Sequence, residues 1–213
     1  MDMQTMRRRK RKVPVMLLSL LVGVAASVIW GGWSMRTQQE LADKVVRLHI
    51  LANSDSAADQ SLKLQVRDAV LARAEEVLLA SDGRGEAETA LREHLQELAL
   101  LAQNTIADHG YDYPVRAELA ETVFPTREYD GFRLPAGSYL ALRMIIGDGE
   151  GKNWWCVVFP PLCAQSTTDL AQTAMAVGFS EEDVRLMEDS GSGEYLLKFK
   201  SIEIWEWLRQ KFL

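Results

Sequence analysis

Two carboxylates, Asp55 and Asp59, are the first side chains whose type and spacing suit acid–base chemistry. They stand four residues apart at the predicted start of a helix, so both would lie on one helix face. Two carboxylates this close can raise the pKa of one of them, which suits a hydrolase that acts on cell-wall material. The alternative is structural, because Ser56 and Asp59 have capping-box spacing and acidic groups stabilise the positive end of a helix. We favour the structural role and expect no catalytic residue.

The other candidate groups also favour structure over catalysis. His94 lies on the apolar face of a predicted helix, and no second ligand follows at a metal-binding spacing, so we expect neither a metal site nor a cofactor. The glycine run Gly147–Gly151 resembles a phosphate loop, but the strand-like stretch Trp154–Phe159 follows it, where a phosphate loop needs a helix. We therefore interpret the run as a flexible hairpin connection.

The two cysteines, Cys156 and Cys163, flank a Pro160-Pro161 pair. In a straight strand their Cα atoms would lie about 23 Å apart, whereas a disulfide requires roughly 4.4–6.8 Å. A bond therefore requires the chain to reverse direction between them. An oxidising compartment favours the bond, and consecutive prolines favour an extended chain that opposes it. A disulfide and a pair of buried free thiols both remain open.

The first 36 residues have the pattern of a membrane-directed segment. Arg7–Lys12 are six basic residues, and they give residues 1–12 a local charge of +5, which leaves −11 for the remainder of a chain whose net charge is −6. This separation speaks against a nucleic-acid-binding domain, which needs positive charge on its folded part. Val13–Met35 carries no charge over 23 residues. As a helix it would be about 34 Å long, enough to cross a hydrocarbon core of roughly 30 Å.

This segment is either an uncleaved signal anchor or a cleavable signal peptide. We favour the anchor because of its length and because Trp30 and Trp33 would lie at the far membrane interface. Small residues at 25–27 suit a cleavage site. Both alternatives keep the basic N-terminus in the cytoplasm and send everything after Arg36 across the membrane. The predicted parts are residues 1–36, the tail with its export segment; residues 37–164, the main ectodomain; and residues 165–213, a C-terminal extension of helix and strand.

The main ectodomain is predicted to be an α+β fold. Between Arg47 and Val70, a strand with alternating apolar residues leads through a tight polar turn into a long amphipathic helix. We expect a mostly antiparallel sheet of about four strands with two long helices on one face. The predicted strands are Val45–Ala52, Tyr113–Ala120, Ser138–Ile146 and Trp154–Phe159, and the predicted helices are Ser56–Ala80 and Glu86–Asp108.

Five stretches of this ectodomain carry a resemblance to a known family. They are HILANSDSAADQSLKLQVRDAV at 49–70, GYDYPV at 110–115, FPT at 124–126, LPAGSY at 134–139 and GKNWWCVVFPPLC at 151–163. With the export segment that precedes them, these stretches resemble the stage II sporulation protein R family of endospore-forming bacteria. The resemblance implies a non-enzymatic signal that is made in the forespore and exported into the space between forespore and mother cell. There it would activate a membrane aspartyl protease of the mother cell, which matures the precursor of sigma-E.

The implied partners are that membrane protease and, through residues 13–35, the membrane itself. We expect the partner to contact a polar turn and a loop, because loops carry recognition and tryptophan is enriched at interface hot spots. The predicted contact residues are Asn53, Ser54, Asp55, Lys152, Asn153, Trp154 and Trp155. Adjacent strand residues point to opposite faces, so at most one of the two tryptophans can lie on the helix-covered side.

Overall fold

The computed structural model describes residues 17–27, 36, 38–129, 132–163, 174–175 and 178–188. The chain divides into two compact units, Met1–Gln38 and Gln39–Leu213. In the first unit, residues 17–27 form a helix with exposed side chains. None of the helices within the described ranges has the length and apolar character that a membrane crossing requires. The predicted export segment, residues 13–35, extends beyond the described residues on both sides and stays a prediction.

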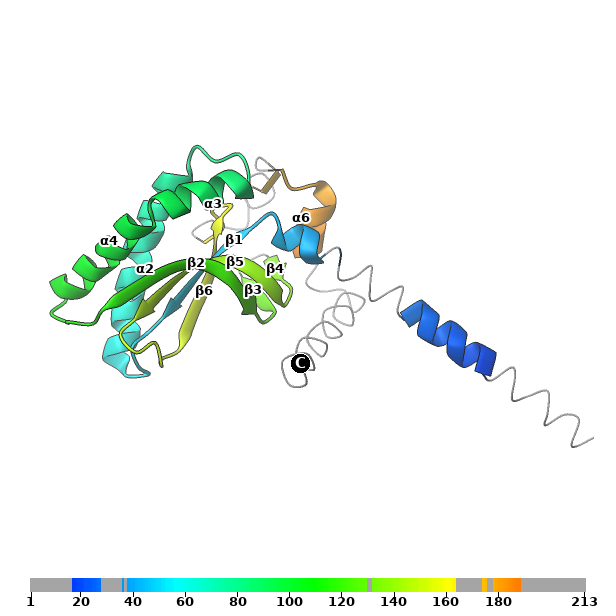
Figure 1. Cartoon of the computed structure of the whole chain (residues 1–213), viewed down its shortest axis with the longest axis horizontal. Helices are drawn as coiled ribbons and strands as arrows, with labels where there is room; N and C mark the ends of the chain where they lie inside the picture. The colour runs from blue at the N-terminus through cyan, green and yellow to red at the C-terminus, as the bar shows by residue number, and fades with distance from the viewer. Residues whose placement is uncertain are drawn as a thin grey trace, which may run out of the picture. The chain divides into compact units, whose positions relative to one another are not determined.

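The second unit is α+β and is built on a mixed four-stranded sheet (Figure 1). Its strands are β1 (Val46–Leu51), β2 (Val115–Phe124), β5 (Gly137–Ile146) and β6 (Asn153–Phe159), in the order β2-β5-β1-β6. β1 pairs with β6, and β2 with β5, in antiparallel fashion, whereas β1 and β5 run parallel. The mostly antiparallel prediction missed this central pair. A long helical connection after β1 allows it, because parallel neighbours need a crossover and not a tight turn.

Helices α2 (Ala57–Leu78), α3 (Arg84–Glu93) and α4 (Leu95–Asp108) follow β1. α2 starts at the predicted cap, where Ser56 Oγ accepts a hydrogen bond of 3.1 Å from the Asp59 amide. The single helix predicted over Glu86–Asp108 is wrong, because the chain breaks at His94 into α3 and α4. His94 has ψ of 7°, and its half-buried ring Nδ1 bonds to the Ala90 carbonyl at 2.9 Å.

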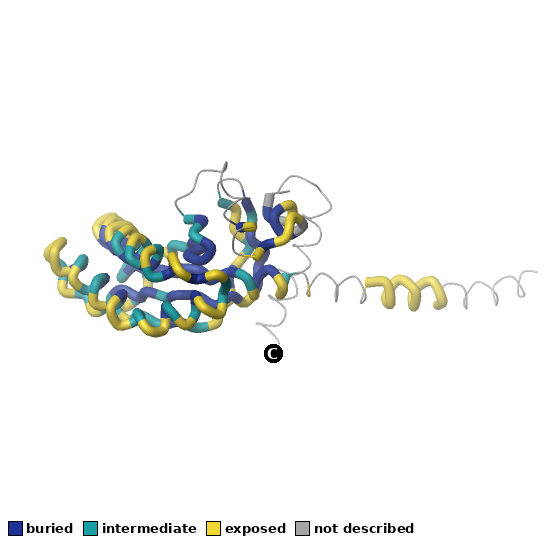
Figure 2. The backbone as a smooth tube through the Cα atoms, turned by 90° about the horizontal axis from the view of Figure 1, so that it is seen from above, coloured by how far each residue is buried: buried dark blue, intermediate teal, exposed yellow. Residues whose placement is uncertain are grey.

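All three of these helices cover one face of the sheet, as the sequence predicted. The core between them consists of alternate strand residues, such as Leu48 and Ile50 of β1 and Leu142 and Met144 of β5, packed against helix residues such as Val66. This face is apolar and mostly buried, and the two central strands, β1 and β5, are largely dark blue in Figure 2. It supplies the hydrophobic free energy that holds the unit together.

The opposite face is partly covered by a hairpin that the sequence did not predict and by described residues of the predicted C-terminal extension. A two-stranded hairpin, β3 (Arg127–Tyr129) and β4 (Phe132–Leu134), packs there with residues 41–42. Described residues of the predicted C-terminal extension, including α6 (Glu181–Glu188), pack against the same cluster. The rest of the extension lies outside the described residues.

α6 begins directly after the capping residue Ser180. Ser180 N donates to Asp183 Oδ2 at 2.8 Å, and Asp183 N donates to Ser180 Oγ at 3.1 Å, which completes a reciprocal capping box. Asp183 also forms an ion pair of 2.5 Å with Lys44.

Candidate functional site

The predicted contact turn and contact loop lie together in the structure. Residues 52–55, at the end of β1, bind residues 147–152, the loop between β5 and β6, and we call this assembly the clasp. The Asn53 side-chain oxygen accepts from the Asp148 amide at 3.1 Å, and the Asn53 carbonyl accepts from the Glu150 amide at 3.2 Å. Asp55 Oδ1 accepts from the Lys152 amide at 2.7 Å. Asn53 and Asp55 of the turn therefore hold the loop.

The glycine run serves this close approach. A Cβ at Gly147 would stand 2.1 Å from the Asn53 side-chain oxygen, and a Cβ at Gly151 would stand 2.2 Å from the Ser54 carbonyl oxygen. Gly147 also has a positive φ of 56°, a conformation that glycine adopts freely. The hairpin interpretation of this run is wrong, because β5 and β6 are not neighbours. The loop passes over the end of β1, which lies between them.

Asp59 accepts hydrogen bonds from the turn, and its environment does not suit a general acid. Its carboxylate is buried, with 4% of the residue exposed, and accepts from the Ser54 hydroxyl at 2.5 Å and the Asn53 amide at 3.0 Å. These hydrogen bonds to Ser54 and Asn53 lower the pKa of Asp59, whereas a general acid needs a raised pKa. Asp55 is thus hydrogen-bonded to the loop of the clasp and Asp59 to its turn. Both interactions favour the structural role of these carboxylates over a role in hydrolysis.

Lys63 ties the clasp to helix α2. Its buried Nζ donates to the Lys152 carbonyl at 2.9 Å and to the Gln60 side chain at 2.7 Å. Burial lowers the pKa of Lys63. The sequence analysis did not single out this residue, although a lysine on the apolar stripe of a predicted helix was a visible signal.

Trp154 and Trp155 follow the clasp and point to opposite faces of the sheet. Trp154 packs on the helix-covered side, where the Arg67 guanidinium lies 4.9 Å from its ring centroid. Trp155 packs on the other side, where the Arg127 guanidinium lies 4.0 Å from its ring centroid. Both tryptophans are half-buried. The alternation that the sequence predicted for this pair is confirmed.

A polar row crosses the sheet on the side of Trp155. The strand register places Trp155 beside His49, His49 beside Arg143, and Arg143 beside Glu118. His49 Nε2 bonds to Asn153 Oδ1 at 2.8 Å, and Arg143 forms an ion pair with Glu118. Burial lowers the pKa of His49, so the ring is held neutral.

Arg47 lies under the same face and is completely buried. Its guanidinium donates to the Tyr129 hydroxyl and lies 3.9 Å from the Phe124 ring centroid and 5.0 Å from that of Tyr139. Within the described part of the chain, its Nε and Nη1 have no hydrogen-bond partner, and no carboxylate forms an ion pair with it. Burial lowers the pKa of Arg47, yet a guanidinium stays charged in proteins.

The sequence analysis missed this polar face, although a signal was present. Arg47 and His49 occupy the positions of β1 that alternate with Leu48 and Ile50. A strand with one apolar and one charged side usually faces water on its charged side. Here Arg47 and His49 are buried, with 0% and 7% exposed, and no local pattern could have revealed that.

With this geometry in place, comparison with known proteins identifies the family. Residues 42–169, more than half of the chain, match the family described as stage II sporulation protein R. The chain belongs to the stage II sporulation protein R family. Stage II sporulation protein R of Bacillus subtilis (strain 168) is 39% identical over 123 residues, which are 58% of this chain and 55% of that relative. The chain thus spans about half the length of the curated relative it matches. No solved structure matches it.

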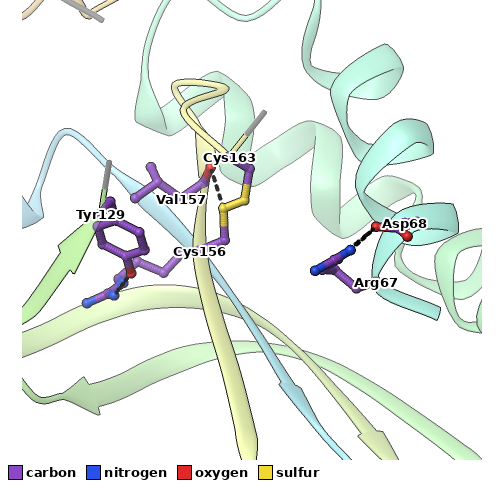
Figure 3. Close-up of a disulfide and its surroundings, with 7 residues drawn as sticks. Arg67, Asp68, Tyr129, Cys156, Val157 and Cys163 are labelled. Atoms are coloured by element: carbon purple, nitrogen blue, oxygen red, sulfur yellow. Dashed lines mark hydrogen bonds and ion pairs between the residues drawn. A yellow bond between two sulfur atoms is a disulfide. The ribbon is translucent and has the colours of Figure 1, made fainter. Parts of the chain in front are cut away.

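The part of the chain that matches the stage II sporulation protein R family contains the clasp, both tryptophans, Arg47 and both cysteines. Cys156 and Cys163 are joined by a disulfide, with their Cα atoms 5.7 Å apart (Figure 3). The chain reverses direction after β6, where the Leu162 amide donates to the Pro160 carbonyl at 2.8 Å. The disulfide closes this reversal against the helix-covered core. Helix α6 lies beyond the matched residues.

The described residues of this family member offer no metal site, since none of their His, Cys, Asp and Glu side chains gather in groups of three or more suited to an ion. His94, the lone histidine considered for that role, is occupied by its bond to the Ala90 carbonyl. The site therefore consists of a turn and loop locked together, and of two tryptophans presented to opposite faces of the sheet.

Proposed function

We propose that this member of the stage II sporulation protein R family is an exported sporulation signal without enzymatic activity of its own. It is made in the forespore and crosses into the space between forespore and mother cell. There it activates a membrane aspartyl protease of the mother cell, which matures the precursor of sigma-E. Residues 13–35 either anchor it in the membrane or are removed after export.

The family match over residues 42–169 is the observation that carries this proposal. Two features of the residues support it. The basic residues 7–12 precede an uncharged segment, which is the pattern of an export signal that retains its N-terminus inside. The carboxylates best placed for hydrolysis, Asp55 and Asp59, hold the clasp together, and the pKa of Asp59 is lowered.

We propose the clasp and the residues that follow it as the surface that the protease contacts. Within this surface, Asn53 and Asp55 hold the loop and Ser54 is bonded to Asp59, whereas Lys152, Asn153, Trp154 and Trp155 are the residues offered to the partner. Lys152 and Asn153 are exposed, and the tryptophans are half-buried. The clasp fixes the start of β6, so the loop would meet its partner with little loss of conformational entropy.

An export swap tests the proposed function. An unrelated cleavable export signal replaces residues 1–36, and precursor processing is measured in sporulating cells by immunoblot. Processing should continue with the swapped signal and should be absent when residues 37–213 are made in the forespore without any signal, because the information lies wholly beyond Arg36.

Two results would overturn this proposal. Processing by the fragment that stays in the cytoplasm would show that export is not required. A swapped protein that is stable and exported but inactive would show that the segment 13–35 takes part in recognition. Protein level and location, measured by fractionation, accompany each strain.

A further inference from the structure

The sheet face that carries Trp155 concentrates positive charge on a unit that is otherwise acidic. The strand side chains on this face include three arginines, Arg47, Arg116 and Arg143, and one carboxylate, Glu118, which is paired with Arg143. Arg127 of β3 adds a fourth arginine above Trp155. The chain beyond residue 12 carries a formal charge of −11, so this face reverses the sign of its surroundings. We call these residues the basic face.

Several of these cations lack a counter-charge. In the described part of the chain, Arg127 is exposed and stacks on Trp155 with no ion pair, and Arg116 is exposed with none either. Arg47 is completely buried, and its Nε and Nη1 have no hydrogen-bond partner among the residues that the structure describes. An unneutralised charge in a low-dielectric interior is unfavourable, and its field reaches further than that of a solvated charge. An anion docked on the basic face would relieve that cost.

The edge strand beside the basic face suits a protein segment as that anion. β6 is the last strand in the order β2-β5-β1-β6 and pairs with β1 alone among the described strands. An extended segment can add to such an edge through main-chain hydrogen bonds. Every second side chain of that segment would then project over Trp155 and Arg127.

A membrane surface fits these observations less well. The Arg127 guanidinium lies over the Trp155 ring, 4.0 Å from its centroid, and the His49 ring is tilted against it with 5.7 Å between ring centroids. The ring thus packs against Arg127, His49 and Phe124 and does not project as an apolar anchor, which interfacial binding requires. Arginine forks also pair with carboxylates in a fixed geometry.

We propose that the basic face and the β6 edge bind an extended acidic segment of a partner protein, with carboxylates of that segment over Arg127. The identity of the partner as the mother-cell protease rests on the proposed function. The acidic character of the bound segment is inferred only from the charges of the basic face.

The test measures binding of a fluorescent peptide of alternating glutamate and threonine to the full-length chain in neutral detergent, by fluorescence anisotropy. Arg127→Gln should weaken binding about tenfold, the effect of losing one charge-assisted pair. Arg67→Gln is the matched control, because Arg67 stacks on Trp154 across the sheet but is neutralised by Asp68 at 2.6 Å. It should leave binding unchanged. Added salt should weaken binding of the wild type.

A second variant and a second peptide complete the test. Arg116→Gln should weaken binding by a smaller factor without affecting folding, since Arg116 is exposed and unpaired among the described residues. The same peptide with glutamine in place of glutamate should not bind. Equal loss with Arg67→Gln, or equal binding of the glutamine peptide, would overturn the proposal.

Lipid vesicles distinguish binding to an acidic protein segment from binding to a membrane surface. Vesicles containing phosphatidylglycerol should not compete with the peptide. If the vesicles bind in an Arg127-dependent way and the peptide does not, the face is a membrane surface and the proposal fails. No protease is present in these measurements, so a negative result here leaves the signalling function standing, and a failed export swap would not alter the binding result.

Discussion

The two faces of the sheet are made by the same strands but differ in what they contain. On the helix-covered face, β1 contributes Leu48 and Ile50, which are fully buried among apolar side chains. On the basic face, β1 contributes Arg47 and His49, which are buried among aromatic rings. Successive side chains of β1 therefore lie alternately in the apolar environment of one face and the charged environment of the other.

This difference indicates that the helix-covered face stabilises the fold and that the basic face serves recognition. Apolar burial on the helix-covered face is directly favourable. Burial of Arg47 on the basic face is unfavourable by itself and is only partly offset by Tyr129 and the stacked rings. A fold selected for stability alone has no need of a buried, unpaired guanidinium. The basic face is therefore where we expect function to reside.

The largest expected contrast comes from one substitution on each face. Leu142→Ala removes a buried side chain that lies beside Leu48 and Leu119, and should lower the free energy of unfolding by about 2–5 kcal/mol. Arg47→Met should change it by less than about 1.5 kcal/mol, because removing the buried charge offsets the lost bond to Tyr129.

Urea unfolding followed by circular dichroism measures both variants. If Arg47→Met destabilises the protein as strongly as Leu142→Ala, Arg47 is a structural residue and the separation between the faces is wrong.

The two tryptophans give the next contrast. Trp154 is held in the helix-covered core, so Trp154→Ala should lower the free energy of unfolding by about 2–3 kcal/mol, somewhat less than for a fully buried tryptophan. Trp155→Ala should cost about half as much stability and reduce precursor processing more than Trp154→Ala does, because only Trp155 of these two proposed contact residues lies on the basic face, outside the helix-covered core.

Thermal unfolding and the processing immunoblot are measured on the same two variants. A loss of processing that only follows the loss of stability in each case would show that both tryptophans are core residues.

The strand, turn and helix around Asn53 could be predicted from sequence because their signals are local. Alternation in β1 and the Ser56 cap need only residues within a few positions of one another. The split at His94 was missed because the apolar stripe continues through it. The β3–β4 hairpin was missed because its strands have three residues each, too few for a period to show.

The site was predicted in part, and the missing part is non-local. The opposite directions of Trp154 and Trp155 follow from the pleat of any strand. The clasp joins Asn53 to Asp148, 95 residues away, and no pattern in either segment points to the other. The parallel pairing of β1 with β5 and the burial of Arg47 depend on the same tertiary arrangement.

The smallest expected effect is a pH dependence that belongs to the basic face. Burial lowers the pKa of His49, and the charges of Arg143 and Arg47 act in the same direction, against the hydrogen bond to Asn153. The unfolded chain therefore binds a proton at this residue more readily than the folded one below about pH 6.5. The stability that neutral His49 contributes is fully present above that pH and is lost as the pH falls toward the folded pKa.

Urea unfolding between pH 7.5 and 5 should show this loss, with a slope of at most about 1.4 kcal/mol per pH unit. His49→Gln should flatten the slope, whereas His109→Gln, at an exposed position after α4, should not. Asp59 should not contribute to this slope. Its pKa is lowered in the folded protein, so the stability that the ionised carboxylate contributes is lost only as the pH falls below the ordinary pKa of an aspartate. An identical slope in wild type and His49→Gln would mean that the acid sensitivity arises at other residues. The pH dependence would then not belong to the basic face.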